Sequence, residues 1–180
     1  MQTTDRSSAG SVTELLRRGG LVLPEQQGET PAHPSWALPD YNGLHDPQGA
    51  ELLGSELGGL LERFAPTRLL IWQDPADLVL GYVVARRLGV SAVRSYDLDG
   101  LVAFDGEFGT GARIALVADA FRDARSVRAM CALARQQGHE VAAAGALVDI
   151  GGAGAEELDE QGVPLASLVK VEPAPRDLSR

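Results

Sequence analysis

The sequence is poor in the residues that build metal, disulfide and nucleophile sites, and each shortage excludes a kind of chemistry. With Cys131 as the only thiol, the chain can form neither a disulfide framework nor a thiolate metal cluster, and this cysteine is expected to pack inside a helix as a small hydrophobe. The three histidines, His33, His45 and His139, are scattered, so none has metal-ligand spacing or a catalytic partner. Lys170 is the only lysine, which leaves arginine to bind any anion.

Long apolar runs are also missing, and no stretch is long enough to span a bilayer. The opening residues MQTTDRSSAG lack the charged and apolar regions of a signal peptide, so a cytoplasmic protein is expected. The formal net charge is −9, which repels nucleic acid and anionic membranes, so neither is expected as a partner.

The composition indicates one globular domain: 180 residues are too few for two comfortable ones, and 44% are hydrophobic. We predict a disordered tail over residues 1–10, a single domain over 11–172 and a C-terminal tail over 173–180. A short helix is expected at 11–20, followed by a proline-rich irregular stretch. Leu53, Leu57, Leu60 and Phe64 recur at helical spacing, which predicts a helix over 50–66 with one buried face.

From residue 67 onwards, predicted strands and helices alternate. The strands are expected at 67–73, 90–96, 113–119, 141–149 and 165–171, and the helices at 74–89, 123–138 and 154–162. This order favours an α/β fold, with a parallel sheet covered by helices on both faces. The glycine-rich stretch 96–112 is expected to form a hairpin or a mobile loop over the strand ends.

Acids follow each of the first four predicted strands. They are Asp74 and Asp77, Asp97 and Asp99, Asp119 and Asp123, and Asp149. In open α/β sheets, ligands bind beyond the carboxyl ends of the strands, where crowded carboxylates raise one another's pKa or attract a divalent cation. The alternative is that aspartate is a common cap and turn residue, which suits Asp77 and Asp123. Asp119 directly ends an apolar strand and is the stronger candidate for ligand contact.

Arginines and aromatic side chains each allow two interpretations. Arg122, Arg125 and Arg128 recur at a spacing of three around a predicted helix N-terminus, where they could clamp an anion or simply lie in solvent. The aromatic residues Trp36, Tyr41 and Trp72 are expected to pack in the core. For Trp36 and Tyr41, stacking against a base is the alternative.

The layout of the chain resembles that of the type I phosphoribosyltransferases, and most of all the orotate phosphoribosyltransferases. The similar stretches are TELLRRGGLVL with WALPDY, DPQGAELLGSELGGLLERF, and GHEVAAAGALVDIGGAGAEELDEQGVPLASLVKV. The resemblance implies a parallel sheet flanked by helices, a small N-terminal hood over the strand ends, and a two-fold dimer.

The resemblance also locates the segments that would handle phosphoribosyl pyrophosphate (PRPP). The segment equivalent to the PRPP loop comprises Ala118, Asp119, Arg122, Asp123, Ala124, Arg125 and Ser126. The segment equivalent to the pyrophosphate loop comprises Gln73, Asp74, Ala76 and Asp77. Neither segment contains glycine, which the family uses to turn backbone amides towards phosphate, and both contain acids that repel phosphate. The segment matching the family's mobile loop keeps Arg94 but has neither lysine nor histidine.

These departures favour a phosphoribosyltransferase-fold protein that is not catalytic and has a binding, regulatory or partner-supporting role in nucleotide metabolism. One alternative is a divergent active transferase in which Arg122, Arg125 and Mg²⁺ replace the loop amides. Another is a binder of small molecules whose cationic or hydroxyl groups suit an acidic crevice. No catalytic residue, resident metal or cofactor is assigned, and Mg²⁺ is expected only with a phosphorylated ligand. A homodimer and a small-molecule or protein partner are the expected assemblies.

Overall fold

The computed structural model describes Glu14, which is helical, and residues 46–171. The predicted hood, most of the predicted helix at 11–20, both tails, Trp36, Tyr41, His33 and His45 lie outside the described residues.

A six-stranded sheet forms the centre of the described region, in the order β3-β2-β1-β4-β5-β6. The strands are β1 (Arg68–Trp72), β2 (Ser91–Leu98), β3 (Leu101–Asp105), β4 (Arg113–Ala118), β5 (Glu140–Asp149) and β6 (Leu165–Lys170). All neighbours pair in parallel except β2 and β3. The predicted parallel sheet is therefore confirmed.

The first part of the glycine-rich stretch 96–112 forms a hairpin from the end of β2 and β3, which is one of its two predicted forms. Asp99 and Gly100 both have positive φ, 52° and 85°, which is the requirement of the tight turn whose twist matches that of paired strands. This turn places an antiparallel edge strand on an otherwise parallel sheet.

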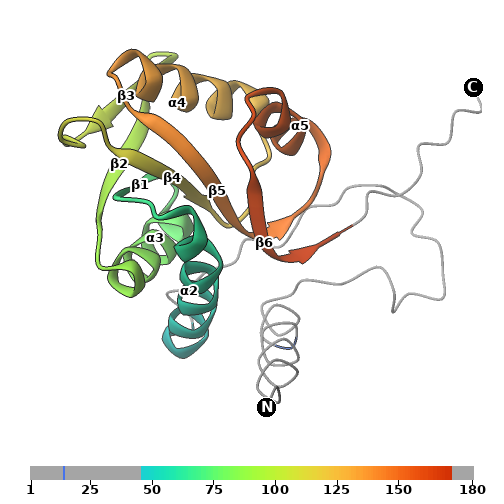
Figure 1. Ribbon diagram of the computed structural model, residues 1–180. Helices are drawn as coiled ribbons and strands as arrows, with labels where there is room; N and C mark the ends of the chain where they lie inside the picture. Colours follow the sequence, from blue (N-terminus) through green and yellow to red (C-terminus); the bar gives the residue numbers. More distant parts are fainter. Residues whose placement is uncertain (1–13, 15–45, 172–180) are drawn as a thin grey trace, which may run out of the picture.

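Helices cover both faces of the sheet (Figure 1). On one side lie α2 (Pro47–Leu61), which the 3₁₀ turn Glu62–Phe64 extends, and α3 (Pro75–Leu88). On the other side lie α4 (Ala124–Gln136) and α5 (Gly152–Glu160). None of the helices in the described part of the chain is long and apolar enough to cross a membrane.

Strand alternation divides the core into two layers. Leu69 and Ile71 of β1 pack with the α2 and α3 side, whereas Leu70 of the same strand packs with the α4 side. Cys131 is fully buried in the α4 layer, which confirms its predicted packing role. Burial on both faces explains why β4 reads as a continuous apolar run.

The chain order reverses between β1 and β4. From β1 the sheet continues to β2 on one side, and from β4 it continues to β5 and β6 on the other. The loops that follow β1 and β4 therefore diverge and leave a crevice at the carboxyl ends of these two strands, the usual ligand position in such sheets.

Candidate functional site

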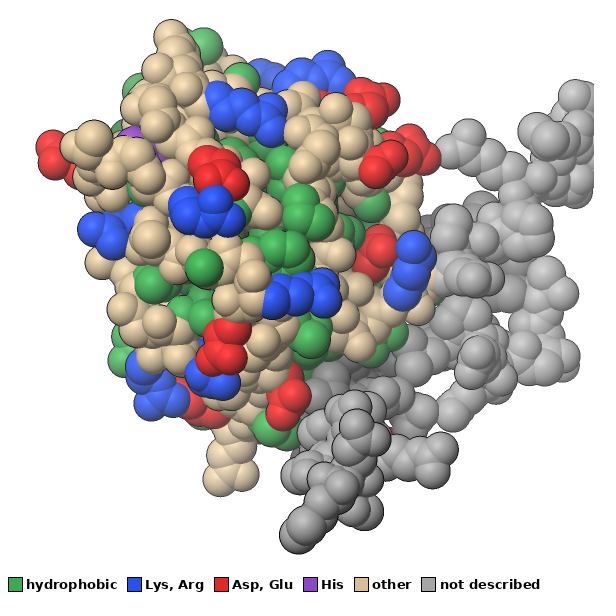
Figure 2. Space-filling model, viewed as in Figure 1, with side chains coloured by type: hydrophobic (Ala, Val, Ile, Leu, Met, Phe, Trp, Pro, Cys, Tyr) green, Lys and Arg blue, Asp and Glu red, His purple; other side chains and the backbone are tan. Residues whose placement is uncertain are grey.

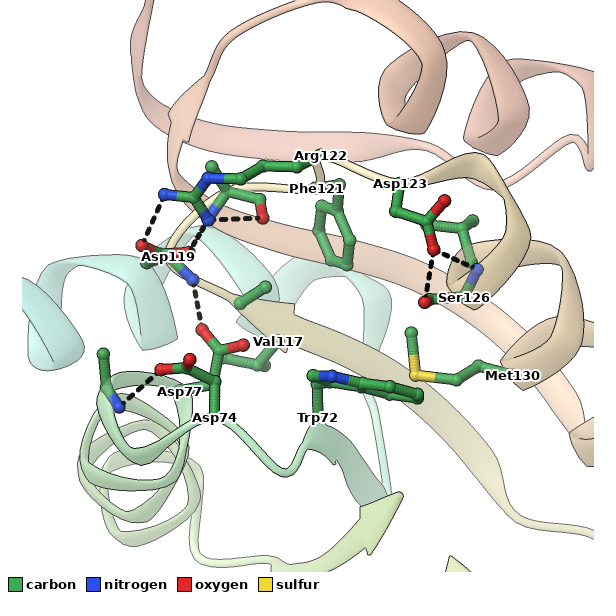
Figure 3. Close-up of a pocket in the computed structure, with 14 residues that line it drawn as sticks. Trp72, Asp74, Asp77, Val117, Asp119, Phe121, Arg122, Asp123, Ser126 and Met130 are labelled. Carbon is green, nitrogen blue, oxygen red and sulfur yellow. Dashed lines mark hydrogen bonds and ion pairs between the residues drawn. The ribbon is translucent and has the colours of Figure 1, made fainter. Parts of the chain in front are cut away.

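A cavity of about 230 Å³ lies at this reversal point, between the loops that follow β1 and β4 (Figure 3). It is lined by Trp72, Asp74, Ala76, Asp77, Val117, Ala118, Asp119, Ala120, Phe121, Arg122, Asp123, Ser126, Val127 and Met130. The structure therefore brings together most of the residues that the sequence singled out. Gln73, in the loop after β1, and Ala124 and Arg125, at the start of α4, do not line the cavity.

The acids at the other strand ends do not join this cavity, contrary to the expectation of a wider acidic crevice. Asp97 accepts a hydrogen bond from the N–H of Gly100 within the β2–β3 hairpin. Asp149 pairs with Lys170 of β6 at 3.5 Å. Neither these two acids nor Asp99 lines the cavity, so they add no charge to its wall.

Asp77 is the buried acid of the site, with 6% of its surface exposed. Its Oδ1 accepts a 2.7 Å hydrogen bond from the backbone N–H of Asp119. Burial, and next the carboxylate of Asp119, raise the pKa of Asp77 to about 7, although the N–H of Asp119 acts in the opposite direction. Asp77 is consequently partly protonated near neutral pH.

The prediction that Asp77 caps α3 is wrong. The cap is Asp74, whose Oδ1 accepts from the N–H of Ala76 at 2.9 Å. Asp77 lies in the first helical turn, where its side chain faces the end of β4. The Asp-Pro pair was the available signal, because proline favours the first helical position and so marks the preceding residue as the cap. Asp46 before Pro47 repeats this arrangement in α2.

Asp119 is bound by Arg122 through two contacts. The Arg122 guanidinium donates to Oδ1 at 2.6 Å and to Oδ2 at 2.9 Å, and it also reaches the carbonyl of Ala120 at 3.4 Å. Such a two-pronged pair holds both side chains in place. The carboxylate predicted to contact ligand is therefore neutralised by its own loop.

Asp123 caps α4, as predicted. Its carboxylate accepts from the N–H of Arg125 at 3.1 Å, from the N–H of Ser126 at 2.8 Å and from the Ser126 hydroxyl. The hydrogen bonds from Ser126 are the largest cause of a lowered Asp123 pKa. The amides at the start of α4 thus already hold an anion.

Two contacts fix the loop between β4 and α4. Arg125 donates to the carbonyl of Gly100 at 2.9 Å, which ties the start of α4 to the β2–β3 hairpin. A Cβ on Gly154 of α5 would lie 2.2 Å from the carbonyl oxygen of Phe121, so this loop rests directly on the α5 backbone. The interpretation of Arg122 and Arg125 as a preformed anion clamp is not what the structure shows, because both guanidinium groups bind oxygen atoms of the chain itself.

The apolar wall of the cavity was missed at the level of sequence. Trp72 ends β1 and lines the cavity together with Met130 of α4, whereas the sequence indicated packing alone for Trp72. The available signal was spacing: Ser126, Val127 and Met130 share one helical face. Among the described residues, no group of three or more acids, histidines or cysteines is arranged to hold a metal ion.

Comparison with known proteins gives similarity of structure alone. No protein-family model matches the sequence, and no curated protein matches it. An orotate phosphoribosyltransferase of Mycobacterium tuberculosis, solved with inorganic phosphate, superposes with a TM-score of 0.67 at 19% identity, over 91% of this chain and 88% of that one. A phosphoribosyltransferase of Corynebacterium diphtheriae gives 0.68 at 18% identity, over 94% and 99%. The Leishmania donovani UMP synthase gives 0.57 at 21% identity over 72% of this chain, which spans only 28% of that longer chain.

The chain has a type I phosphoribosyltransferase fold. The mostly parallel sheet flanked by helices is the one expected from the resemblance in sequence layout. With identities of 18–21% in these three comparisons, the similarity extends to the fold and leaves the chemistry to be argued from the cavity itself.

Proposed function

We propose that this protein uses the phosphoribosyltransferase fold as a binding module and does not transfer phosphoribosyl groups. One observation carries the proposal: both helix N-termini at the cavity are occupied by carboxylates of the chain. Asp74 accepts from the start of α3, and Asp123 accepts from the start of α4. Helix N-termini are where proteins of this kind of architecture hold phosphate groups.

A phosphate would have to displace these carboxylates or lie beside them. Losing a cap costs about 0.5–2 kcal/mol. A second negative charge at ~4 Å costs about 4 kcal/mol at an effective dielectric constant of ~20. Catalysis adds a further demand, because each missing donor to developing charge slows a reaction roughly 100-fold or more. Both the segment equivalent to the PRPP loop and the segment equivalent to the pyrophosphate loop lack the glycines that would turn backbone amides towards phosphate.

The alternative, a divergent transferase using PRPP and Mg²⁺, depends on Arg122 and Arg125 as substitutes for the loop amides. Arg122 forms a two-contact ion pair with Asp119, and Arg125 donates a hydrogen bond to the carbonyl of Gly100 in the β2–β3 hairpin. Using either side chain for phosphate would break an existing contact. We therefore place this alternative second.

The partners follow as proposals from the same fold. We expect a two-fold homodimer and a binding, regulatory or partner-supporting role in nucleotide metabolism. The face shown in Figure 2 fits a small-molecule or protein partner better than nucleic acid. On the face shown in Figure 2, acidic and basic side chains are interspersed, with apolar side chains between them. That face offers a polyanion no continuous basic surface.

Isothermal titration with PRPP and Mg²⁺ tests the proposal, and the Mycobacterium tuberculosis enzyme, which has been solved with PRPP bound, is the positive control. We expect no heat with this protein at millimolar PRPP. A micromolar dissociation constant that is lost on Arg125→Ala would show that Arg125 replaces the loop amides, and transfer of the phosphoribosyl group to orotate or a purine base would overturn the proposal and establish the divergent transferase. A thermal-shift panel of orotate, purine bases and nucleotides extends the test, because a ligand at 100 times its dissociation constant adds about 2.7 kcal/mol of stability.

A further inference from the structure

We infer that the cavity binds a small organic cation, an ammonium group carried on an aromatic or apolar body, with the ammonium at Oδ2 of Asp77 and the body against Trp72. This inference rests on the proposed function, since a cavity that held PRPP would be occupied by an anion. It names the chemistry of the ligand, which the fold leaves open.

The first support is the unsatisfied half of the Asp77 carboxylate. Oδ1 accepts from the N–H of Asp119, but Oδ2 accepts no hydrogen bond from the described residues, although only 6% of the surface of Asp77 is exposed. Figure 3 shows this second oxygen directed towards the interior of the cavity. A buried carboxylate oxygen without a donor is costly, and an ammonium donor would satisfy it.

The second support is the balance of charge around that oxygen. Four carboxylates and one guanidinium line the cavity, an excess of three acids. The other three carboxylates already have donors: Asp119 has Arg122, and the two caps hold backbone amides. Oδ2 of Asp77 is thus the buried carboxylate oxygen left for a ligand, in surroundings that favour a positive charge.

A metal ion is a poorer fit than an organic cation. Mg²⁺ and Ca²⁺ require several oxygen ligands at short range. No group of three or more potential ligands is assembled among the described residues, and Oδ2 of Asp77 is the one buried carboxylate oxygen of the cavity lining that has no donor from the described residues. An ammonium group needs fewer oxygen ligands than a metal ion does. The apolar body that carries it can also pack against the apolar side of the cavity, which a metal ion would leave without contacts.

The third support is that apolar wall. Trp72 lies along one side of the cavity, with Met130 next to its ring and Phe121 opposite (Figure 3). Tryptophan is the best aromatic partner for a cation, and methionine adapts to flat rings. At 230 Å³ the cavity is below the ~300–1,000 Å³ of sites for drug-sized ligands, so a ligand the size of benzylammonium is appropriate.

The test compares benzylammonium with benzyl alcohol and benzoate, which have a similar body but no positive charge. Binding to the full chain is followed at about pH 8 by calorimetry and by Trp72 fluorescence in a Trp36→Phe background. We expect a dissociation constant below about 1 mM for benzylammonium and at least tenfold weaker binding of the other two probes. Asp77→Asn, which keeps the Oδ1 acceptor, should weaken benzylammonium at least tenfold.

Asp99→Asn is the matched control, because it removes the same charge from the hairpin turn, where asparagine tolerates the positive φ. It should leave benzylammonium binding unchanged. Equal binding of all three probes, no binding of benzylammonium, or equal losses in both variants would overturn the inference. The proposed function is tested separately by PRPP, so a protein that binds neither PRPP nor benzylammonium would retain the proposed function and lose only this ligand class.

Discussion

The backbone N–H of Asp119, at the end of β4, donates to the buried carboxylate of Asp77 in the first turn of α3, at 2.7 Å. The two residues are 42 positions apart in the sequence, and the parallel pairing of β1 with β4 brings them together. This hydrogen bond joins the two loops that form the cavity. It also places one carboxylate beside another, which is a destabilising arrangement at neutral pH.

We predict that Asp77→Asn stabilises the protein increasingly as the pH rises from about 4 to about 7. The pKa of Asp77 is raised from 3.8 to about 7 on folding, so the folded protein holds this proton more tightly than the unfolded chain does. The contribution of Asp77 to the free energy of unfolding is therefore fully present below pH 3.8 and is lost as the pH rises through 7. Above pH 7 the difference should reach about 4 kcal/mol, since each pKa unit corresponds to 1.36 kcal/mol. Urea unfolding of both proteins across this range measures it, with Asp99→Asn as the control. A difference that does not vary with pH would contradict the prediction.

Binding of benzylammonium should release a proton and strengthen roughly tenfold between pH 6 and 8, as the ionised fraction of Asp77 grows. The charged groups that act on Asp77 are Asp119 and Asp74, which raise its pKa, and Arg122, which lowers it. Calorimetry in two buffers of different ionisation enthalpy measures the released proton. An affinity independent of pH in this range would show that the ligand does not use the Asp77 carboxylate.

Gly154→Ala should destabilise the protein by about 3 kcal/mol or more, because its Cβ would meet the Phe121 carbonyl oxygen at 2.2 Å. Gly59→Ala is the matched control on α2, because a Cβ there meets nothing within 4 Å. It should raise the free energy of unfolding by about 0.5–1 kcal/mol. Chemical denaturation of both variants measures the two effects. Similar stabilities of the two variants would mean that α5 does not pack directly against the loop between β4 and α4.

Asp123→Ala should lower the free energy of unfolding by about 1 kcal/mol at neutral pH, because it removes the cap of α4. Since the Asp123 pKa is lowered in the folded protein, this contribution is present above its unfolded pKa and fades as the pH falls through the folded one. Thermal unfolding at pH 7 and at about pH 3 should therefore show a smaller difference in acid. An equal loss at both pH values would show that the carboxylate charge does not contribute.

Self-association is predicted from the resemblance to a family in which two-fold dimers are common. Light scattering at micromolar concentration should return twice the monomer mass. The monomer mass alone would remove the prediction.

Local chemistry determined much of the fold in advance. Alternating apolar runs and helical spacings specified the parallel sheet, and Asp123 could be identified as a cap because a cap depends only on the next three residues. The missing glycines in the two loops were equally visible, since backbone turning is a property of individual residues.

Tertiary structure decided the rest. The burial of Asp77, and with it the raised pKa, arises from the register between β1 and β4, which no local pattern specifies. The pairing of Arg122 with Asp119 and the apolar wall of Trp72 and Met130 likewise depend on loops and helices that meet only when the sheet assembles. Residue type determines which groups can cap, turn or ionise, whereas the environment that shifts their chemistry is created by segments distant in the sequence.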